Sequence, residues 1–310
     1  MSFLKIGLVG CGAWGKFILR DLVSLGCEVH VVARSKTACD NAAAYGAFKI
    51  VKNVSDLDTD LEGCVVATTT ETHFEVIQEL LFLKIPLFVE KPLCPSLRQA
   101  ELLAEVETPI FIMHKWRYHD GIVELANIRL SGDLGQIRSI KCQRGEWGVA
   151  HQDVDATWIL LPHDLSIMAH ILGEFPSPIY ASGLKRKEAA RDGSDYFLQM
   201  RGELKAAFCH SSFEVSFRDP LRRREVTVLF DDGAVSLEDP LADHLILRKT
   251  PMAGQKGAVT QKLPIDTEFP LKKELRSFVN YLNGGEPPLS SLKFELDLIN
   301  IIDQLRGLSA

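Results

Sequence analysis

The sequence predicts an α/β protein, with an N-terminal doubly wound parallel sheet and a C-terminal α+β domain built on a large open, mainly antiparallel sheet. Three observations support this prediction. The first third of the chain alternates short apolar runs with helical segments, as parallel sheets covered on both faces do. After about Trp116, strands follow one another through short turns, which is typical of antiparallel sheets. The length of 310 residues exceeds what one hydrophobic core usually serves.

In the N-terminal part, apolar and β-branched runs predict strands over residues 3–10, 28–33, 47–51, 63–69, 86–90 and 109–113. Helices are expected between them, over residues 13–26, 36–46, 72–83 and 96–106. On the first of these helices, Phe17, Ile18 and Leu22 share one face, and Gly26 stands where a helix C-terminus favours glycine. This alternation predicts a parallel sheet with helices on both faces.

The remainder is expected to contain a helix over 121–131, a strand over 137–144, one helical segment near 154–172 and strands up to about 249. Residues 224–239 resemble a hairpin whose turn is Asp232-Gly233. Residues 253–261 predict a flexible loop, and the chain closes with helices over 271–285 and 291–308. We therefore expect a cofactor-binding domain over 1–118 and a substrate-binding and oligomerisation domain over 119–310. The last helices would be free to pack back on the first domain.

Composition excludes several function classes. A net charge of −6 and a pI of about 5.9 give no global attraction to nucleic acid or anionic membranes, with Arg222-Arg223-Arg224 as a local exception. The seven cysteines form no C-x-x-C pair, so we expect reduced thiols and neither a disulfide framework nor a metal site. The N-terminus lacks the features of a signal peptide, and no run of about 18 apolar residues occurs. These features predict a cytoplasmic protein without nucleic-acid or membrane partners.

A glycine-rich loop follows the first predicted strand. It reads Gly10-x-Gly12-x-x-Gly15, with Ala13 and Trp14 between the last two glycines. The first glycine permits a tight turn, the second lets the backbone approach a pyrophosphate, and the third lets helix and strand pack closely. The following helix would offer its unpaired N–H groups to the anion. Because strand, loop and helix occur in this order, a dinucleotide site is favoured over a simple tight turn.

The second predicted strand runs into Ala33-Arg34-Ser35-Lys36. In NAD-binding proteins this strand usually ends in a carboxylate that binds the ribose hydroxyls. Here a guanidinium and a hydroxyl stand instead, and both can bind a phosphate. We expect NADP as the cofactor, with NAD still possible. A solvated basic turn is the alternative.

Further candidates lie at the ends of the strands over 63–69 and 86–90. The strand over 86–90 ends in Glu90, followed by Lys91, and the strand before it ends near Thr68 and Thr69, with His73 on the following turn. Ligands of doubly wound sheets bind at the carboxyl ends of the strands. Lys91 is therefore expected beside a bound nicotinamide, where it can transfer a proton, and Glu90 is expected to orient it. A structural ion pair at a strand end is the alternative.

These motifs together resemble the oxidoreductase family of glucose–fructose oxidoreductase, inositol dehydrogenase and the rhizopine protein MocA (Gfo/Idh/MocA). The similarity rests on the glycine loop, on "VVATTTETHFEVIQELL", on "VEKPL", on "MHKWRYH" and on "SGDLGQI", and it extends over essentially the whole chain. The chain departs from the family pattern at Thr69, where members commonly have proline. The resemblance implies a Rossmann domain and a nicotinamide-dependent activity.

The resemblance also assigns roles. It implies that Lys91 binds the reacting oxygen of the substrate and that Arg117 is the arginine of the crossing between domains. The second family motif matches "WILLPHDLSI", which makes His163 the second proton-transfer residue, with Trp158 and Asp164 as candidate substrate residues. Ile159 stands where many members carry an aspartate, which puts substrate orientation in doubt.

A segment of the second half bears on the substrate. "SFRDPLRRR" (216–224) resembles a strand of members that act on nucleotide-linked amino sugars or uronates, so Arg222 is a candidate for binding an anionic group. A charged strand edge that discourages aggregation is an equal alternative. His170, deeper in the second motif, is expected to be a packed or surface histidine.

The leading hypothesis is an NAD(P)-dependent oxidoreductase that transfers hydride between the cofactor and a hydroxyl or keto group. Its substrate would be a carbohydrate-like small molecule: a sugar, a cyclitol or a sugar nucleotide. Imine or aldehyde reduction on the same scaffold is one alternative. A cofactor-binding sugar sensor without turnover is another, because fold alone does not fix function. A homodimer or homotetramer is expected from the resemblance.

Overall fold

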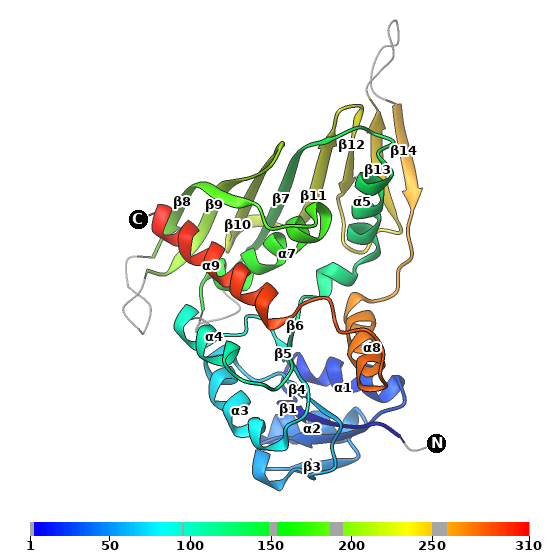
Figure 1. Cartoon of the computed structure of the whole chain (residues 1–310), viewed down its shortest axis with the longest axis vertical. Coiled ribbons are helices and arrows are strands. Elements are labelled where there is room, and N and C mark those ends of the chain that lie inside the picture. Colours follow the sequence, from blue (N-terminus) through cyan, green and yellow to red (C-terminus); the bar gives the residue numbers. More distant parts are fainter. Residues whose placement is uncertain (1–2, 95, 149–153, 187–194, 250–258, 310) are drawn as a thin grey trace, which may run out of the picture. The chain divides into compact units, whose positions relative to one another are not determined.

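The computed structural model describes residues 3–94, 96–148, 154–186, 195–249 and 259–309. The chain divides into two compact units, Met1–Lys115 with Phe269–Leu296 and Trp116–Glu268 with Asp297–Ala310. Figure 1 labels most of the strands and α-helices of both. The division falls within the last helix, α9 (Leu292–Leu308).

The first unit contains a six-stranded parallel sheet in the order β3-β2-β1-β4-β5-β6. Its strands are β1 (Lys5–Val9), β2 (Glu28–Val32), β3 (Lys49–Val51), β4 (Gly63–Val66), β5 (Leu87–Glu90) and β6 (Ile110–Met113). β1 lies between β2 and β4, so the strand order reverses at its carboxyl end. This is the position at which doubly wound sheets bind ligands.

Helices of the first unit are amphipathic and bury one face each. They are α1 (Gly15–Ser24), α2 (Lys36–Ala44), α3 (His73–Leu80), α4 (Leu97–Ala104) and α8 (Pro270–Leu282), with short 3-10 helices η1 (Val54–Asp56), η2 (Thr70–Thr72), η3 (Leu81–Leu83) and, across the division, η4 (Lys115–Tyr118). The core combines Ile18 and Leu22 of α1 with strand residues and with Leu275 and Phe278 of α8. A segment from the end of the chain thus completes the core of the first unit.

The second unit contains an eight-stranded sheet in the order β14-β13-β12-β11-β7-β10-β9-β8. Its strands are β7 (Ile137–Trp147), β8 (Ser177–Lys185), β9 (Phe197–Ala206), β10 (Cys209–Ser216), β11 (Arg218–Phe230), β12 (Gly233–Leu237), β13 (His244–Lys249) and β14 (Val259–Pro264). β7 and β10 pair in parallel, and the other pairs are antiparallel. The predicted combination of a doubly wound domain and a large, mainly antiparallel sheet is confirmed.

Figure 1 shows α5 (Asp120–Ser131) and α7 (Leu161–Leu172) along this sheet. The short helix α6 (Ala156–Ile159) directly precedes α7. α5 packs on β12, α6 on β9 and β10, and α7 on β7 and β10. β9 alternates buried and more exposed residues along most of its length, as expected for a sheet with one covered face.

Three sequence predictions need correction in detail. The helical segment expected near 154–172 is two helices, α6 and α7, because Pro162 has no N–H to donate and restricts the backbone just before it. The hairpin over 224–239 forms, but its turn is Asp231-Asp232, with Gly233 already paired in β12. Residues 259–261, expected in a loop, belong to β14, and 253–258 lie outside the described residues.

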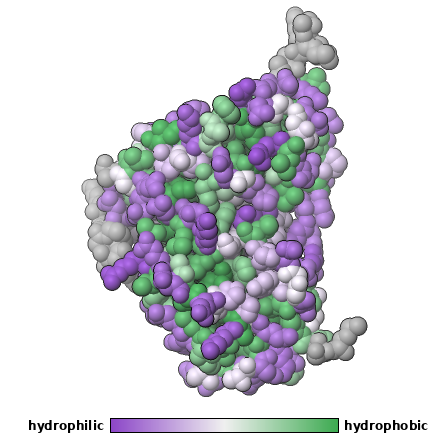
Figure 2. Space-filling model, in the orientation of Figure 1, coloured by the Kyte–Doolittle hydropathy of each residue, from purple (hydrophilic) through white to green (hydrophobic). Residues whose placement is uncertain are grey.

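On the face shown in Figure 2, hydrophilic and hydrophobic residues are interspersed. None of the helices in the described part of the chain is long and apolar enough to cross a membrane. All seven cysteines are described and free; Cys39 is half-buried and the others are buried. Burial raises the pKa of Cys64 to about 12.

Candidate functional site

The glycine loop has the geometry that a dinucleotide requires. Gly10 has φ +98°, and a Cβ there would lie 2.6 Å from the Ala67 carbonyl oxygen. A Cβ on Gly15 would lie 2.2 Å from the Gly10 carbonyl oxygen, so loop and helix pack too closely for any side chain. A Cβ on Gly12 would meet nothing within 4 Å. The loop is therefore tight at its first and third glycines and open at the second, where a pyrophosphate would approach.

The amino end of α1 is also suited to an anion. No side chain caps this end, where Trp14 occupies the N-cap position. Asn41 of α2 donates from Nδ2 to the Cys11 carbonyl oxygen at 2.9 Å, which anchors the loop from the next helix. Asn41 was not found by sequence reasoning, because it lies 30 residues from its partner. Gly12, Ala13 and Trp14 are exposed.

The basic turn follows β2 directly. Ala33 is buried, while Arg34 and Ser35 are exposed. Ser35 Oγ accepts the Ala38 N–H at 3.1 Å and so caps α2. Lys52 adds a further cation, because its Nζ donates to the Arg34 carbonyl oxygen at 3.5 Å and to Cys39 Sγ at 3.0 Å. The turn between β2 and α2 thus carries positive charge and a hydroxyl where a ribose-binding carboxylate would stand.

His73 joins the turns that follow β4 and β5. It is 1% exposed, and its two ring nitrogens lie 3.0 Å from the Pro92 carbonyl oxygen and 3.2 Å from the Thr68 carbonyl oxygen. Burial lowers the pKa of His73, which the two carbonyls oppose. Thr68 is half-buried and Thr69 exposed. In this position His73 would influence a cofactor through the two turns that it connects, and direct contact with it stays a prediction.

Glu90 ends β5 with both carboxylate oxygens engaged. Oε1 accepts the indole N–H of Trp14, and Oε2 accepts the backbone N–H of Lys91 at 3.0 Å. The Lys115 ammonium lies 4.3 Å from the centroid of the Trp14 ring. Glu90 therefore links the glycine loop to the turn that carries Lys91, which is half-buried. The orientation of Lys91 by Glu90 would act through the backbone.

A second carboxylate, that of Glu295, also contacts the turn that carries Lys91. Glu295 is fully buried, accepts from the Leu93 N–H at 3.4 Å and lies 2.6 Å from His114 Nε2. His114 follows β6, so this contact fixes the ends of two neighbouring strands. Glu295 and His114 were not found from the sequence, because they are 181 residues apart.

In the second unit, His163 lies beside an aromatic and cationic group. The Trp116 ring stacks on His119 with centroids 5.2 Å apart and meets the His163 ring edge-on at 6.4 Å. The Arg144 guanidinium lies 4.6 Å from the Trp116 centroid. His163 is half-buried at the start of α7. The structure thus brings His163 together with Trp116 and Arg144, neither of which was predicted as a site residue.

Asp164 is 1% exposed and faces the sheet. Its Oδ1 accepts from Arg144 Nε at 2.8 Å, and the side chains of both residues are almost completely buried. Burial raises the pKa of Asp164, which the Arg144 guanidinium opposes. This arrangement suits a residue that holds β7 and α7 together. The substrate contact predicted for Asp164 stays a prediction.

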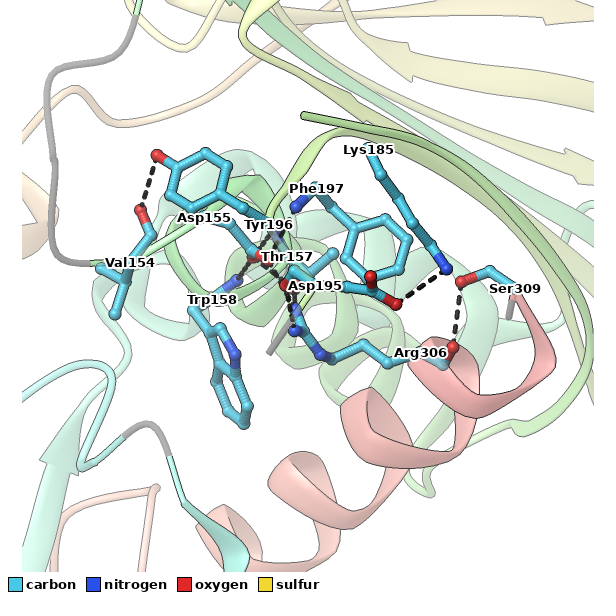
Figure 3. A network of polar contacts seen from close by, with 10 residues as sticks. All are labelled: Val154, Asp155, Thr157, Trp158, Lys185, Asp195, Tyr196, Phe197, Arg306 and Ser309. Carbon is cyan, nitrogen blue, oxygen red and sulfur yellow. Dashed lines mark hydrogen bonds and ion pairs between the residues drawn. The ribbon is translucent and has the colours of Figure 1, made fainter. Parts of the chain in front are cut away.

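Trp158 and Ile159 lie on α6, which is anchored by the network in Figure 3. Asp155 caps the helix by accepting the Thr157 N–H at 2.9 Å. Its other oxygen accepts the Phe197 N–H at 3.0 Å and pairs with Arg306 of α9 at 2.6 Å. Trp158 and Ile159 are both buried. An N-cap aspartate is a recognisable sequence signal, but its pairing with Arg306 is not.

The remaining candidates differ in exposure. Arg117 is half-buried, and burial lowers its pKa to about 10. Burial, with the Arg117 charge as a smaller cause, lowers the pKa of His170 to about 4. Arg222 is exposed, whereas Arg224 pairs with Glu146 at 2.6 Å. Arg222 is therefore the arginine of the run that faces solvent most openly. No group of His, Cys, Asp and Glu in the described residues could hold a metal ion.

Comparison with known proteins identifies the first unit. Residues 4–108 match the oxidoreductase family with an NAD-binding Rossmann fold, the Gfo/Idh/MocA family. The match ends before the second unit begins. The resemblance is thereby confirmed for the motifs within residues 4–108.

Relatives with assigned activities cover different shares of the chain. An inositol 2-dehydrogenase of Salmonella paratyphi B is 28% identical over 187 residues, which are 55% of this chain and 55% of that protein. The matched stretch thus spans little more than half the length of that relative. A UDP-N-acetylglucosamine 3-dehydrogenase of Acidithiobacillus ferrooxidans is 22% identical over 296 residues, covering 93% of this chain and 91% of that one.

Solved structures show the same fold over the whole chain. The structure of the Acidithiobacillus ferrooxidans enzyme superposes with a TM-score of 0.82 at 19% identity, covering 99% of this chain and 98% of that one. A levoglucosan dehydrogenase in complex with NADH and levoglucosan superposes with a TM-score of 0.84 at 14% identity, covering 99% and 97%. At these identities the structures establish the fold of both units.

Proposed function

We propose that the protein is an NAD(P)-dependent oxidoreductase that acts on a CH–OH group, or the corresponding keto group, of a sugar, cyclitol or sugar nucleotide. The observation that carries this proposal is the glycine loop, closed at Gly10 and Gly15, open at Gly12 and placed where the strand order reverses. The activities of the inositol, levoglucosan and UDP-N-acetylglucosamine dehydrogenases support the substrate class.

Each part of the first unit would have a defined task. The glycine loop and the amino end of α1 would hold the pyrophosphate, while Glu90 keeps the Lys91 turn in register with the loop. A bound nicotinamide supplies the hydride donor or acceptor. Lys91 would take the hydroxyl proton during oxidation and return it during reduction. His163, whose ring lies against Trp116, is the second proposed proton-transfer residue.

Reduction of a panel of keto-sugars, followed through NADPH and NADH absorbance, tests the activity. We expect turnover with at least one carbohydrate-like substrate, and Lys91→Met should lower kcat by at least about 100-fold, because general acid–base catalysis contributes that much or more. A non-catalytic sensor is the second candidate, favoured by Ile159 in place of an aspartate. Tight cofactor binding without any turnover, unchanged by Lys91→Met, would establish the sensor.

Turnover with imines or aldehydes instead of sugars would show that the substrate class differs from the one proposed.

We further propose NADP as the preferred cofactor, supported by exposed Arg34 and Ser35 at the end of β2. Arg34→Ala should weaken NADPH binding about tenfold or more while NADH changes little, because the guanidinium would bind the 2′-phosphate. Lys36→Ala, which removes a neighbouring exposed cation, is the matched control. Equal losses for both cofactors would reject the phosphate assignment.

The assembly and the location are also proposals. A homodimer or homotetramer in the cytoplasm would agree with the family match of residues 4–108 and with the free thiols. Sedimentation velocity of the full chain decides the assembly: a monomer over the micromolar range would reject the oligomer.

A further inference from the structure

Glu274 is an acidic residue in the apolar core of the first unit. Its side chain is 0% exposed and lies on the face of α8 that also carries Leu271 and Phe278, both core residues. Within the part of the chain that the structure describes, neither carboxyl oxygen has a hydrogen-bond partner. An ionised carboxylate there would cost several kcal/mol. The acid is therefore held in its neutral form.

Two charged groups act on Glu274, the Glu90 carboxylate and the Lys115 ammonium. Burial raises the pKa of Glu274 well above its ordinary value, the Glu90 carboxylate raises it further, and the Lys115 ammonium opposes both. Glu90 already accepts from Trp14 and from the Lys91 backbone, and Lys115 lies over the Trp14 ring. Glu274 thus interacts electrostatically with Glu90, which connects the glycine loop with the Lys91 turn, and with Lys115, which lies over the Trp14 ring of that loop.

α8 also packs against α1, β4 and β5, and within the described residues Glu90, at the end of β5, and Lys115 are the charged groups that shift the pKa of Glu274. On α1, Arg20 Nε and Asp21 Oδ1 form an ion pair of 2.8 Å, and the Lys16 ammonium lies 5.1 Å from the Phe17 ring centroid. The balance at Glu274 is therefore set by Glu90, by Lys115 and by any charge placed at the carboxyl end of β5.

We propose that Glu274 is a positioning residue that senses the redox state of the cofactor. It stays neutral in the free protein, releases its proton to solvent when the positively charged oxidised nicotinamide binds near Glu90, and remains protonated with the uncharged reduced ring. This inference rests on the proposed function. A buried carboxylate is stabilised by a nearby positive charge, so the oxidised ring would replace the proton as its counter-charge.

By thermodynamic linkage, this proton release makes the relative affinity for the two cofactor forms depend on pH. If binding of the oxidised cofactor releases a proton that binding of the reduced cofactor does not, the ratio of their affinities must rise with pH, by at most tenfold per pH unit. The protein would then favour oxidised cofactor in alkaline solution and reduced cofactor in acid. A purely structural Glu274 would leave this ratio independent of pH, apart from titration of other groups at the site.

Isothermal titration calorimetry in buffers of different ionisation enthalpy counts the protons released by the full chain. We expect NADP⁺ to release up to one proton more than NADPH, and NAD⁺ up to one more than NADH, since each pair differs in the charge of the ring. Glu274→Gln should abolish the difference, whereas Asp21→Asn, at a buried acid on α1 paired with Arg20, should retain it. Equal proton release in the wild type, or a difference that survives in Glu274→Gln, would overturn the inference.

A second measurement uses the unmodified protein, so it tests the inference even if Glu274→Gln does not fold. Infrared difference spectra should show loss of a protonated-carboxyl band when oxidised cofactor binds and no loss with reduced cofactor. The same band change with both forms would also refute the inference. If neither cofactor binds, the proposed function fails together with it. If both bind without a difference in protons, the redox sensing alone fails.

Discussion

At the residue scale, burial of the His170 ring makes the stability of the protein depend on pH. Its pKa is lowered from 6.5 to about 4, first by burial and then by the Arg117 charge. Between pH 6.5 and about pH 4, the His170 ring is therefore mostly protonated in the unfolded chain and mostly neutral in the folded protein. The stability that the neutral ring confers is complete above pH 6.5 and is lost as pH falls toward 4.

His170→Asn should remove this part of the pH dependence. Between pH 7.5 and pH 5 we expect the wild type to lose up to about 2 kcal/mol more unfolding free energy than the variant, from the difference between the two pKa values. Urea unfolding of both proteins at the two pH values measures this difference. His210→Asn, at an exposed histidine of β10, is the control and should retain the wild-type dependence. Parallel curves for wild type and His170→Asn would contradict the assignment.

At the element scale, the buried Arg144–Asp164 pair joins β7 to α7, the helix that carries His163. Removing one charge of such a pair leaves the other unpaired in the core. Arg144→Met should therefore destabilise the protein by about 3–5 kcal/mol, measured by urea unfolding. Arg144→Met combined with Asp164→Leu should recover most of that loss, because two apolar side chains can replace a buried ion pair. A double variant no more stable than Arg144→Met would show that the pair has no such coupling.

The short helix α6 depends on Asp155 in a different way. Asp155→Ala removes the N-cap and leaves Arg306, whose side chain is 15% exposed, without its carboxylate, so we expect a loss of about 3 kcal/mol. Asp155→Asn keeps an oxygen that can cap the helix and should lose only about 1–2 kcal/mol. Urea unfolding, with Trp158 fluorescence as a local probe, separates the two effects. Equal losses would mean that the cap contributes nothing beyond the charge.

The elements themselves could mostly be predicted from the sequence, because periodicity and turn residues are local. The parallel strands, the helices from α1 to α5 and the hairpin of β11 and β12 follow from such patterns. The break between α6 and α7 was missed although Pro162 marks it, since the apolar periodicity continues across it. Arg144, Asn41 and Glu295 could not be found, because each acts through a partner that only the fold brings near.

At the scale of the whole molecule, the first unit is discontinuous in sequence. The alternation of strands and helices in the sequence ends near Trp116, but the compact unit includes Phe269–Leu296 as well as Met1–Lys115. The Phe278 ring of α8 stacks on Phe88 of β5 with centroids 4.9 Å apart, and a Cβ on Gly63 of β4 would meet Phe278 Cζ at 3.0 Å. Phe278 and Leu275 are both 0% exposed. The sheet of the first unit therefore lacks part of its apolar cover without α8.

A fragment ending at Lys115 should consequently fail to form the stable native unit. Loss of a buried phenylalanine alone costs about 3–5 kcal/mol, and the fragment loses a whole helix face. We expect residues 1–115 to show little protection in amide hydrogen exchange and to bind neither NADPH nor NADH. Adding a peptide of residues 269–296 should restore protection in β1, β4 and β5, whereas the same peptide with Phe278→Ala and Leu275→Ala should not. A fragment 1–115 that is protected and binds cofactor without the peptide would show that α8 is dispensable for this unit.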